Sequence, residues 1–314
     1  MPPSEATLTQ WFDDHRAFLW GLSYRITGSA ADADDVVQDT FVKAHQRAPA
    51  QLAHPRRWLM RLAVNAARDV LRRRKRRSYI GPWLPTPIET SGDGVPPSFE
   101  PVVEGQTLEG RYDLMESVSL AFLQALEALT PTQRAVLLLR DVFDYSAAEV
   151  AAVLDTSEGN IRIIHLRTRR VMESYERRRS QPTAAQRERT AEALQQFLEL
   201  LAAGDVHGIE RMLASDARTI TDANGEFTAL FRPLVGRWRV ARFFGQFSVA
   251  RRRGHVGVTI RHVNGLPTAD IEVESPRGQQ PPRLLLGIDL NAAGEIANVW
   301  VIASSRKLAA IHAR

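Results

Sequence analysis

The stretch SAAEVAAVLDTSEGNIRIIHLRTRRVM, residues 146–172, contains two short helical patterns separated by a turn. Ser146 followed three residues later by Glu149 forms a capping box, which predicts that a helix begins here. The Asp-Thr pair after this helix favours a turn, and Ser157 is a suitable N-cap for a second helix. This spacing predicts a helix-turn-helix, whose second helix enters the major groove of DNA.

The second helix of this stretch is predicted to have two different faces. The residues that share an inward face at helical spacing are Ile161, Ile164, Thr168 and Met172. The outward face is rich in arginine, which suits contact with bases and phosphates. Its candidate DNA contacts are Glu158, Gly159, Arg162, Ile163, Leu166, Arg167 and Arg170. Arg162 and Arg170 are the strongest of these, and a plain helical hairpin with a charged exterior stays open as the alternative.

A second helical block lies upstream and ends in the basic run RRRKRR, residues 72–77. Asn65, Asp69, Arg72 and Arg76 fall on one face of the helix that carries this run. Amide, carboxylate and guanidinium groups along one stripe can contact base edges and phosphates, although a solvated face would look similar. The block's candidate DNA contacts are Trp58, Asn65, Asp69, Arg72, Arg73 and Arg76. For Trp58, stacking on an unpaired base is one interpretation, and ordinary core packing is the favoured one.

The segment DADDVVQDTF, residues 32–41, predicts an amphipathic helix with an acidic outer face. Val36, Val37 and Phe41 turn inward at helical spacing. An acidic face repels DNA and suits a basic protein surface. The candidate protein contacts of this segment are Asp32, Asp35, Gln38 and Asp39.

Length and composition set the wider frame. The chain has 314 residues, above the size of about 250–300 at which one core usually suffices, so we expect several domains. The net charge of +5 favours an acidic partner. The absence of cysteine excludes disulfides and thiolate zinc sites. Because no apolar run approaches about 18–20 residues, we expect a cytoplasmic protein without a membrane partner.

Periodicity divides the chain into helical and mixed segments. The expected order is a helical domain at 8–78, a linker at 79–112, a helical domain at 113–175, a linker at 176–186 and a mixed domain at 187–314. The first linker is rich in Pro and Gly and is long enough to hold the two helical domains well apart. In the last domain, helices combine with strand-like runs at 217–221, 227–231, 257–263, 269–273, 284–290 and 296–302.

Together these segments resemble the extracytoplasmic-function (ECF) sigma factors of bacterial RNA polymerase. Residues 32–44 are similar to the family's segment that binds the polymerase clamp, and residues 54–77 to its helix that melts and reads the minus-ten element. Residues 126–170 are similar to its domain that reads the minus-thirty-five element. The resemblance implies core RNA polymerase and promoter DNA as partners of the candidate contacts above.

The word GPWLPTP, residues 81–87, and the last domain resemble a subgroup with a fused SnoaL-like domain. This domain is a cone of curved sheet and helices, also seen in nuclear transport factor two (NTF2) and ketosteroid isomerase. The subgroup's Asp-Gly-Gly-Gly-type and Asn-Pro-Asp-Lys-Leu-type words are only partly kept here, as DANGEF at 222–227 and SSRKL at 304–308. The resemblance implies regulatory contacts at Trp83, Leu84, Pro85, Asp222, Gly225, Lys307 and Leu308.

The expected fold class is multidomain, with two all-α sigma domains followed by an α+β SnoaL/NTF2-like domain. The expected function is that of an alternative sigma factor, not an enzyme, whose fused domain packs on the sigma domains and modulates promoter recognition, melting and initiation. We expect no metal, cofactor or catalytic residue, and a small ligand of the last domain stays open.

Two alternatives remain. One is a helix-turn-helix regulator that acts without polymerase. The other is a small-molecule isomerase or cyclase in the last domain. Its candidate acids and bases are Asp222, Asp270, Asp289, His255 and His262, for which ordinary surface or strand-end placement is favoured.

Overall fold

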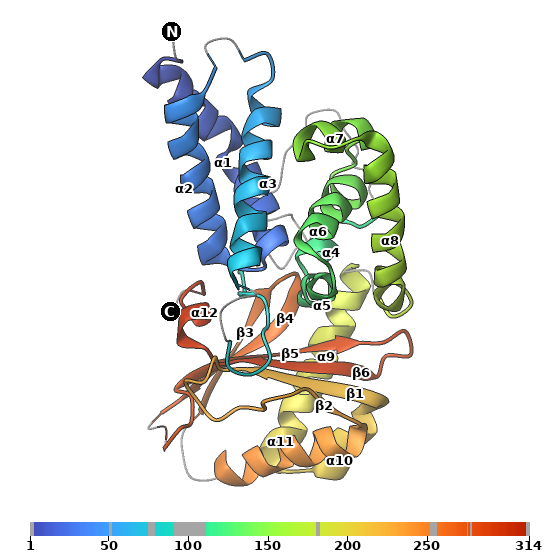
Figure 1. Ribbon diagram of the computed structural model, residues 1–314. Helices are drawn as coiled ribbons and strands as arrows, with labels where there is room; N and C mark the ends of the chain where they lie inside the picture. The colour runs from blue at the N-terminus through green and yellow to red at the C-terminus, as the bar shows by residue number, and fades with distance from the viewer. Residues whose placement is uncertain are drawn as a thin grey trace. The chain divides into compact units, whose positions relative to one another are not determined.

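The computed structural model describes residues 3–49, 52–74, 79–90, 111–179, 183–251, 256–274, 276 and 278–311. The chain forms two compact units (Figure 1). Unit 1 comprises Met1–Ser78, Pro96–Val118 and Phe122–Arg177, and unit 2 comprises Tyr79–Val95, Ser119–Ala121 and Arg178–Arg314. Candidate residues Arg76 and His255 lie outside the described residues.

Unit 1 begins with three helices that pack against one another, α1 (Glu5–Thr27), α2 (Ala30–Arg47) and α3 (Pro55–Arg74). Ser4 and Ser29 cap α1 and α2 by accepting hydrogen bonds from backbone amides in the first turn. Gly28 ends α1 at φ 66°, a left-handed conformation that glycine adopts without strain. Apolar residues at helical spacing, such as Leu22 and Leu59, form the buried core.

The rest of unit 1 is a chain of short helices that ends in the predicted helix-turn-helix. Its elements are α4 (Leu114–Val118), α5 (Leu120–Ala125), a 3-10 turn (Leu126–Ala128), α6 (Pro131–Leu137), a π-helical turn (Leu138–Val142), α7 (Ala147–Leu154) and α8 (Glu158–Glu176). The predicted capping box of Ser146 and Glu149 opens α7, and hydrogen bonds from Ser146 hold the pKa of Glu149 below its ordinary value. Asp155 follows at φ 55°, and Ser157 caps α8. The predicted helix-turn-helix is therefore confirmed.

The two helical domains of unit 1 contact each other. From the length of the linker we had expected them to stand apart. Helix α3 packs against α6 and α7. Two buried arginines cross this contact. Arg25 donates to Ser117 Oγ at 2.7 Å, and Arg134 donates to the carbonyl oxygen of Ile26 at 2.8 Å. Because Ile26 lies in the last turn of α1, this bond satisfies a carbonyl that has no partner within its own helix.

Unit 2 is an α+β domain built on a six-stranded sheet in the order β2-β1-β6-β5-β4-β3. Its strands are β1 (Leu213–Asp222), β2 (Leu234–Val235), β3 (Val256–Val263), β4 (Leu266–Val273), β5 (Arg283–Leu290) and β6 (Ile296–Ile302). Strands β1 and β6 are parallel, and the other neighbours are antiparallel. Its helices are α9 (Ala184–Ala203), α10 (Val206–Met212), α11 (Arg237–Arg251) and α12 (Ser305–Leu308). The predicted fold class is confirmed.

Two apolar cores lie on opposite faces of this sheet. On one face, α9 packs against β4 and β5, and α11 packs against β1. On the other face, Leu84 of the expected linker joins Leu285, Trp300 and Leu308 in a second cluster. Residues 84–88 are buried, so part of the expected linker completes the core of unit 2.

One predicted strand, at residues 227–231, is wrong. These residues form no strand, because Thr228 N donates to Gln279 O and Leu230 N donates to the side-chain oxygen of Thr221 instead of to a neighbouring backbone. The short β2 pairs with β1 instead, and the sequence interpretation had missed it.

Candidate functional sites

Helix α8 presents the predicted DNA-reading face to solvent. Its exposed residues include Glu158, Gly159, Arg162, Ile163, Leu166, Arg167 and Arg170. On the opposite face Ile161, Thr168 and Met172 are buried, and Ile164 is half-buried, which confirms the predicted inward pattern. Arg162 Nη2 lies 2.5 Å from Glu158 Oε1 on the surface. An exposed ion pair of this kind contributes little, so a phosphate or base can compete for the guanidinium.

Helix α3 exposes the predicted polar stripe. Asn65, Asp69, Arg72 and Arg73 are exposed, and Trp58 is half-buried. Arg72 Nη1 lies 2.6 Å from Asp69 Oδ1, which holds both side chains on the same face.

Arg74, inside the basic run, differs from its neighbours. It forms an ion pair with Asp32 and donates to the carbonyl oxygen of Thr27 at 2.6 Å. Both side chains of the ion pair are partly buried. Asp32 is therefore paired with Arg74 and only partly exposed, in contrast to its expected place on the acidic face. Arg74 accordingly joins α3 to α1 and α2, although a solvated or phosphate-binding role was expected along this run.

The two candidate DNA-reading domains meet along α3. Arg61 Nη2 lies 3.1 Å from Asp155 Oδ2 in the turn before α8, and Arg57 Nη2 lies 3.6 Å from Glu149 Oε1 in α7. Arg68 donates to Thr132 Oγ1 at 2.9 Å. The contacts of Arg57 and Arg61 hold the helix-turn-helix beside α3 within unit 1, and that of Arg68 joins α3 to α6.

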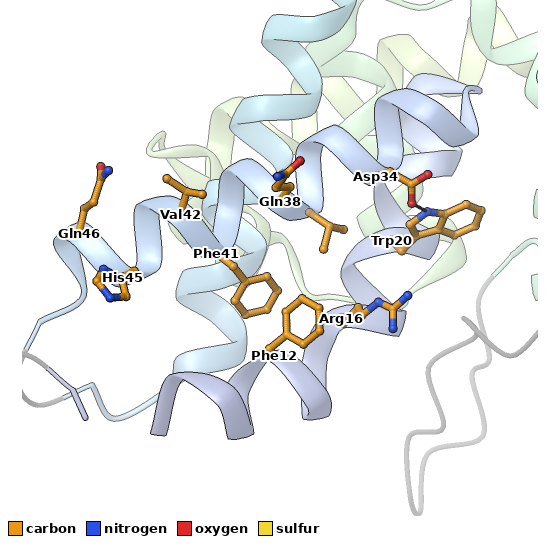
Figure 2. A pocket seen from close by; sticks show the side chains of 10 residues that line it. Phe12, Arg16, Trp20, Asp34, Gln38, Phe41, Val42, His45 and Gln46 are labelled. Carbon is orange, nitrogen blue, oxygen red and sulfur yellow. Dashed lines mark hydrogen bonds between the residues drawn. The ribbon is translucent and has the colours of Figure 1, made fainter. Parts of the chain in front are cut away.

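The outer face of α2 combines acidic residues with an apolar groove. Asp35, Gln38 and Asp39 are exposed, as expected. The groove, about 570 Å³ in volume, lies between α1 and α2 (Figure 2). It is lined by Phe12, Arg16, Trp20, Asp34, Val37, Gln38, Phe41, Val42, His45 and Gln46.

Aromatic contacts shape this groove. Figure 2 shows Phe12 and Phe41 pointing toward each other, with ring centroids 4.9 Å apart in an edge-to-face arrangement. Trp20 Nε1 donates to Asp34 Oδ1 at 2.7 Å at the other end. Sequence reasoning missed Phe12 and Val42. Val42 lies four residues after Gln38, so its place beside the acidic face could have been found from helical spacing.

In unit 2, the predicted regulatory residues gather around the carboxylate of Asp222. Tyr79 Oη donates to Oδ1 at 2.5 Å, and the Leu84 amide donates to Oδ2 at 2.6 Å. Lys307 Nζ lies 2.5 Å from Oδ2 and also donates to the Leu84 carbonyl oxygen. The ammonium lies 4.5 Å from the Trp83 ring centroid. We call residues 79–90, held in this way, the anchored segment.

The remaining predicted regulatory residues lie in the same region. Pro85 and Leu308 are buried, and Leu308 packs in the same cluster as Leu84. Gly225, at φ 76°, lies against Ile80, where an added β-carbon would come within 2.9 Å of Cδ1. Glycine thus permits both the turn and the close approach.

A second set of contacts, not foreseen from the sequence, holds the far end of the anchored segment. Ile88 N donates to Asn264 Oδ1 at 3.1 Å, and Asn264 N donates to Ile88 O at 3.0 Å. Thr90 N donates to His262 O at 2.9 Å, and Arg261 Nη1 lies 2.6 Å from Glu89 Oε1. The Asn-Gly pair at 264–265 is a hairpin signal that could have located this turn, though not its partner.

Unit 2 also contains a largely apolar cavity of about 280 Å³ that is partly open. Asp222 lines the cavity, whereas Asp270 bonds to Arg261 and Arg283 elsewhere. Burial opposes ionisation of Asp270, but the bonds from the two arginines outweigh it and lower the pKa. Burial raises the pKa of Asp289 to about 6. Among the described candidates for acid–base chemistry, only Asp222 lies at the cavity.

Comparisons with known proteins agree with these features. The family model for sigma-70 region 2 matches residues 11–77, and that for sigma-70 region 4 matches residues 119–172. The chain is 30% identical over 274 residues to the ECF RNA polymerase sigma factor SigJ of Mycobacterium tuberculosis, with 82% of each chain covered. The chain belongs to the ECF sigma factors.

Further matches are consistent with membership of the ECF sigma factors. The chain is 30% identical over 160 residues to the ECF RNA polymerase sigma factor SigL of M. tuberculosis, covering 50% of this chain and 81% of that one. The crystal structure of M. tuberculosis SigJ superimposes with a TM-score of 0.71 at 25% identity and covers 96% of this chain and 98% of that one. The predicted family and the function of an ECF sigma factor are therefore confirmed.

The partners of an ECF sigma factor are RNA polymerase and promoter DNA, as expected from the sequence. Relatives of this family are transcription factors and not enzymes. In the described part of the chain, no helix is both long and apolar enough to cross a membrane.

Proposed function

We propose that this ECF sigma factor reads the upstream promoter element with α8 and the downstream element with α3. The observation that carries the proposal is the exposed face of α8, where Arg162, Arg167 and Arg170 stand clear of the buried side. The exposed Asn65, Asp69, Arg72 and Arg73 support the assignment of α3. Trp58 is half-buried, so part of its ring is accessible for stacking.

We further propose that core polymerase docks on the outer face of α2. Asp35, Gln38 and Asp39 provide an exposed acidic edge, and the groove beside them exposes Phe12 and Val42. An apolar centre with a charged rim is the usual composition of a protein interface. Asp32 supports this surface indirectly, because its ion pair with Arg74 fixes the start of α2.

The docking proposal can be tested with one pair of matched variants. Val42→Glu places a charge at the groove, and Val235→Glu places the same charge at a similarly exposed position in unit 2. Affinity for core polymerase should fall at least tenfold in the first variant only, because desolvating an unpaired charge in an interface costs more than about 1.4 kcal/mol. Equal affinities would refute the groove as the docking surface.

For the fused domain, we propose that it restrains initiation by holding the anchored segment. The segment belongs to the chain between the two promoter-reading domains, and its buried bonds to Asp222 and Lys307 oppose its use elsewhere. A restrained segment must be released before the linker can follow the path between two promoter elements. The contacts of Arg57 and Arg61 with the helix-turn-helix add a second restraint within unit 1.

The test is in vitro transcription with core polymerase and the full chain. Leu84 is buried, so Leu84→Asp should expel the anchored segment and raise the yield of promoter-directed transcripts. Ile80→Asp serves as the control, because Ile80 is exposed in the same segment. Circular dichroism shows whether each variant stays folded. Unchanged or lower yield from folded Leu84→Asp would overturn the restraint.

A further inference from the structure

The cavity of unit 2 has walls suited to an apolar guest. Its lining includes Leu201, Phe243, Phe244, Phe247, Val256, Ile271, Leu284, Leu286 and Val301. These side chains come from α9, α11 and the sheet face that the two helices cover. A guest bound against such groups gains affinity from burying apolar surface.

The size and charge of the cavity define the class of guest. An engineered apolar cavity of about 150 Å³ binds benzene, so a volume of about 280 Å³ suits a molecule with two rings. Among the lining residues that the structure describes there is no Lys or Arg, and two carboxylates, Asp222 and Glu274, are present. The Asp222 charge is compensated by Lys307, whereas Glu274 is exposed. An anionic guest would meet no cation among these described residues, so a neutral guest is favoured.

We propose that this cavity binds a neutral, apolar molecule of two rings and that its occupancy strengthens the hold on the anchored segment. The second half of this proposal rests on the proposed restraint by the fused domain, while the binding half does not. A guest that favours the anchored state shifts the population toward it by its difference in affinity between the two states.

The coupling follows from residues that belong to both the cavity wall and the anchor. Thr221, Asp222, Ala223 and Ala303 line the cavity. The Asp222 side chain binds the anchored segment, and its backbone carbonyl accepts from Ala303 N at 2.8 Å. A guest that packs against this wall therefore supports the atoms that hold Leu84.

The cavity wall also adjoins the anchored segment through the turn that contains Leu230. Thr221 Oγ1 accepts from Leu230 N at 2.7 Å, and both Thr221 and Leu230 line the cavity. Gly81 approaches the same turn, since an added β-carbon there would lie 3.6 Å from the Leu230 carbonyl oxygen. The cavity wall and the anchored segment are thus adjacent at two places.

Binding is tested by calorimetric titration of the full chain with 1-naphthol, in the absence of polymerase. Ala229→Phe adds a ring to the cavity lining, and Ala292→Phe adds the same ring to the exposed turn between β5 and β6. We expect Ala229→Phe to weaken binding at least tenfold, Ala292→Phe to leave it unchanged, and 1-naphthoate to bind at least tenfold more weakly than 1-naphthol. No binding of 1-naphthol, or equal binding by both variants, would overturn the site.

Coupling is tested by hydrogen exchange of the Leu84 amide, which bonds to Asp222 in the buried anchor. Saturating 1-naphthol should slow this exchange severalfold in the wild-type chain and have no effect in Ala229→Phe. Binding with unchanged or faster exchange would overturn the coupling. Because neither measurement uses transcription, their failure is distinct from failure of the proposed restraint, which is measured by transcript yield.

Discussion

Removing the ammonium of Lys307 should loosen the anchored segment and destabilise unit 2. The group lies beside the nearly fully buried Asp222, donates to the Leu84 carbonyl oxygen and sits over the rings of Tyr79 and Trp83. The variant Lys307→Met keeps most of the aliphatic stem and deletes only the charge. It leaves a buried carboxylate without its cation.

The expected magnitude follows from these contacts. Removing one partner of a buried ion pair costs about 3–5 kcal/mol, because the other charge stays buried. Here the Tyr79 hydroxyl and the Leu84 amide continue to donate to Asp222, which favours the lower end of that range. Loss of the cation–π contacts adds about 0.5–1 kcal/mol. We therefore expect unit 2 to lose about 3–4 kcal/mol of unfolding free energy.

The assay is native-state hydrogen exchange of the slowest amides in β5 and β6, which reports the unfolding of unit 2 alone. Arg306→Met is the matched control, because Arg306 lies in the same short helix and is exposed. Adding Asp222→Asn to Lys307→Met should recover part of the loss, since it removes the stranded charge. A loss below about 1 kcal/mol in Lys307→Met, or a loss equal to that of the control, would refute the reasoning.

Three other outcomes are expected. Arg162→Ala should cost about 1–3 kcal/mol in promoter binding and relax specificity if the guanidinium reads a base, whereas loss of a phosphate contact would weaken binding to all sequences and make its salt dependence shallower. Filter binding over a salt series would separate these cases. Unchanged affinity and unchanged salt dependence would remove Arg162 from the interface. Burial raises the pKa of Asp289 to about 6, whereas the unfolded carboxyl ionises at about 3.9, so its contribution to stability is fully present below about pH 4 and falls by about 3 kcal/mol as the pH rises to about 7. Urea unfolding should find this slope reduced in Asp289→Asn, and an identical slope would contradict it. Gly287→Ala should destabilise unit 2 by at least about 1–3 kcal/mol, because the new β-carbon would overlap the Trp300 ring, and a wild-type melting temperature would refute this.

Local patterns predicted the helix-turn-helix well, because its determinants lie within one or two turns of chain. Ser146 and Glu149 form the expected capping box, and the inward and outward faces of α8 follow from helical spacing alone. Strand runs in unit 2 were found for a similar reason, since alternation is a local signal. The run at 227–231 failed because its amide partners, Gln279 and Thr221, could not be known from local pattern.

Contacts between distant residues account for the rest of what was missed. Arg74 looked like its neighbours in the basic run, and its pairing with Asp32 depends on how α2 and α3 pack. Asn264 and Ile88 exchange two hydrogen bonds across a long separation in sequence. The regulatory residues were named through family resemblance, and no spacing rule would have brought Leu84, Asp222 and Lys307 together.

The burial of residues 84–88 in unit 2 has a consequence for how such a protein could be dissected or recombined. Truncation near residue 178 would expose the apolar side chains of Leu84 and Ile88, leaving an aggregation-prone surface on the shortened chain. The excised domain would in turn carry an open furrow beside Trp300 and Leu308. The regulatory domain is therefore discontinuous in sequence, and a gene fusion that transferred it to another sigma factor would also have to include the anchored segment.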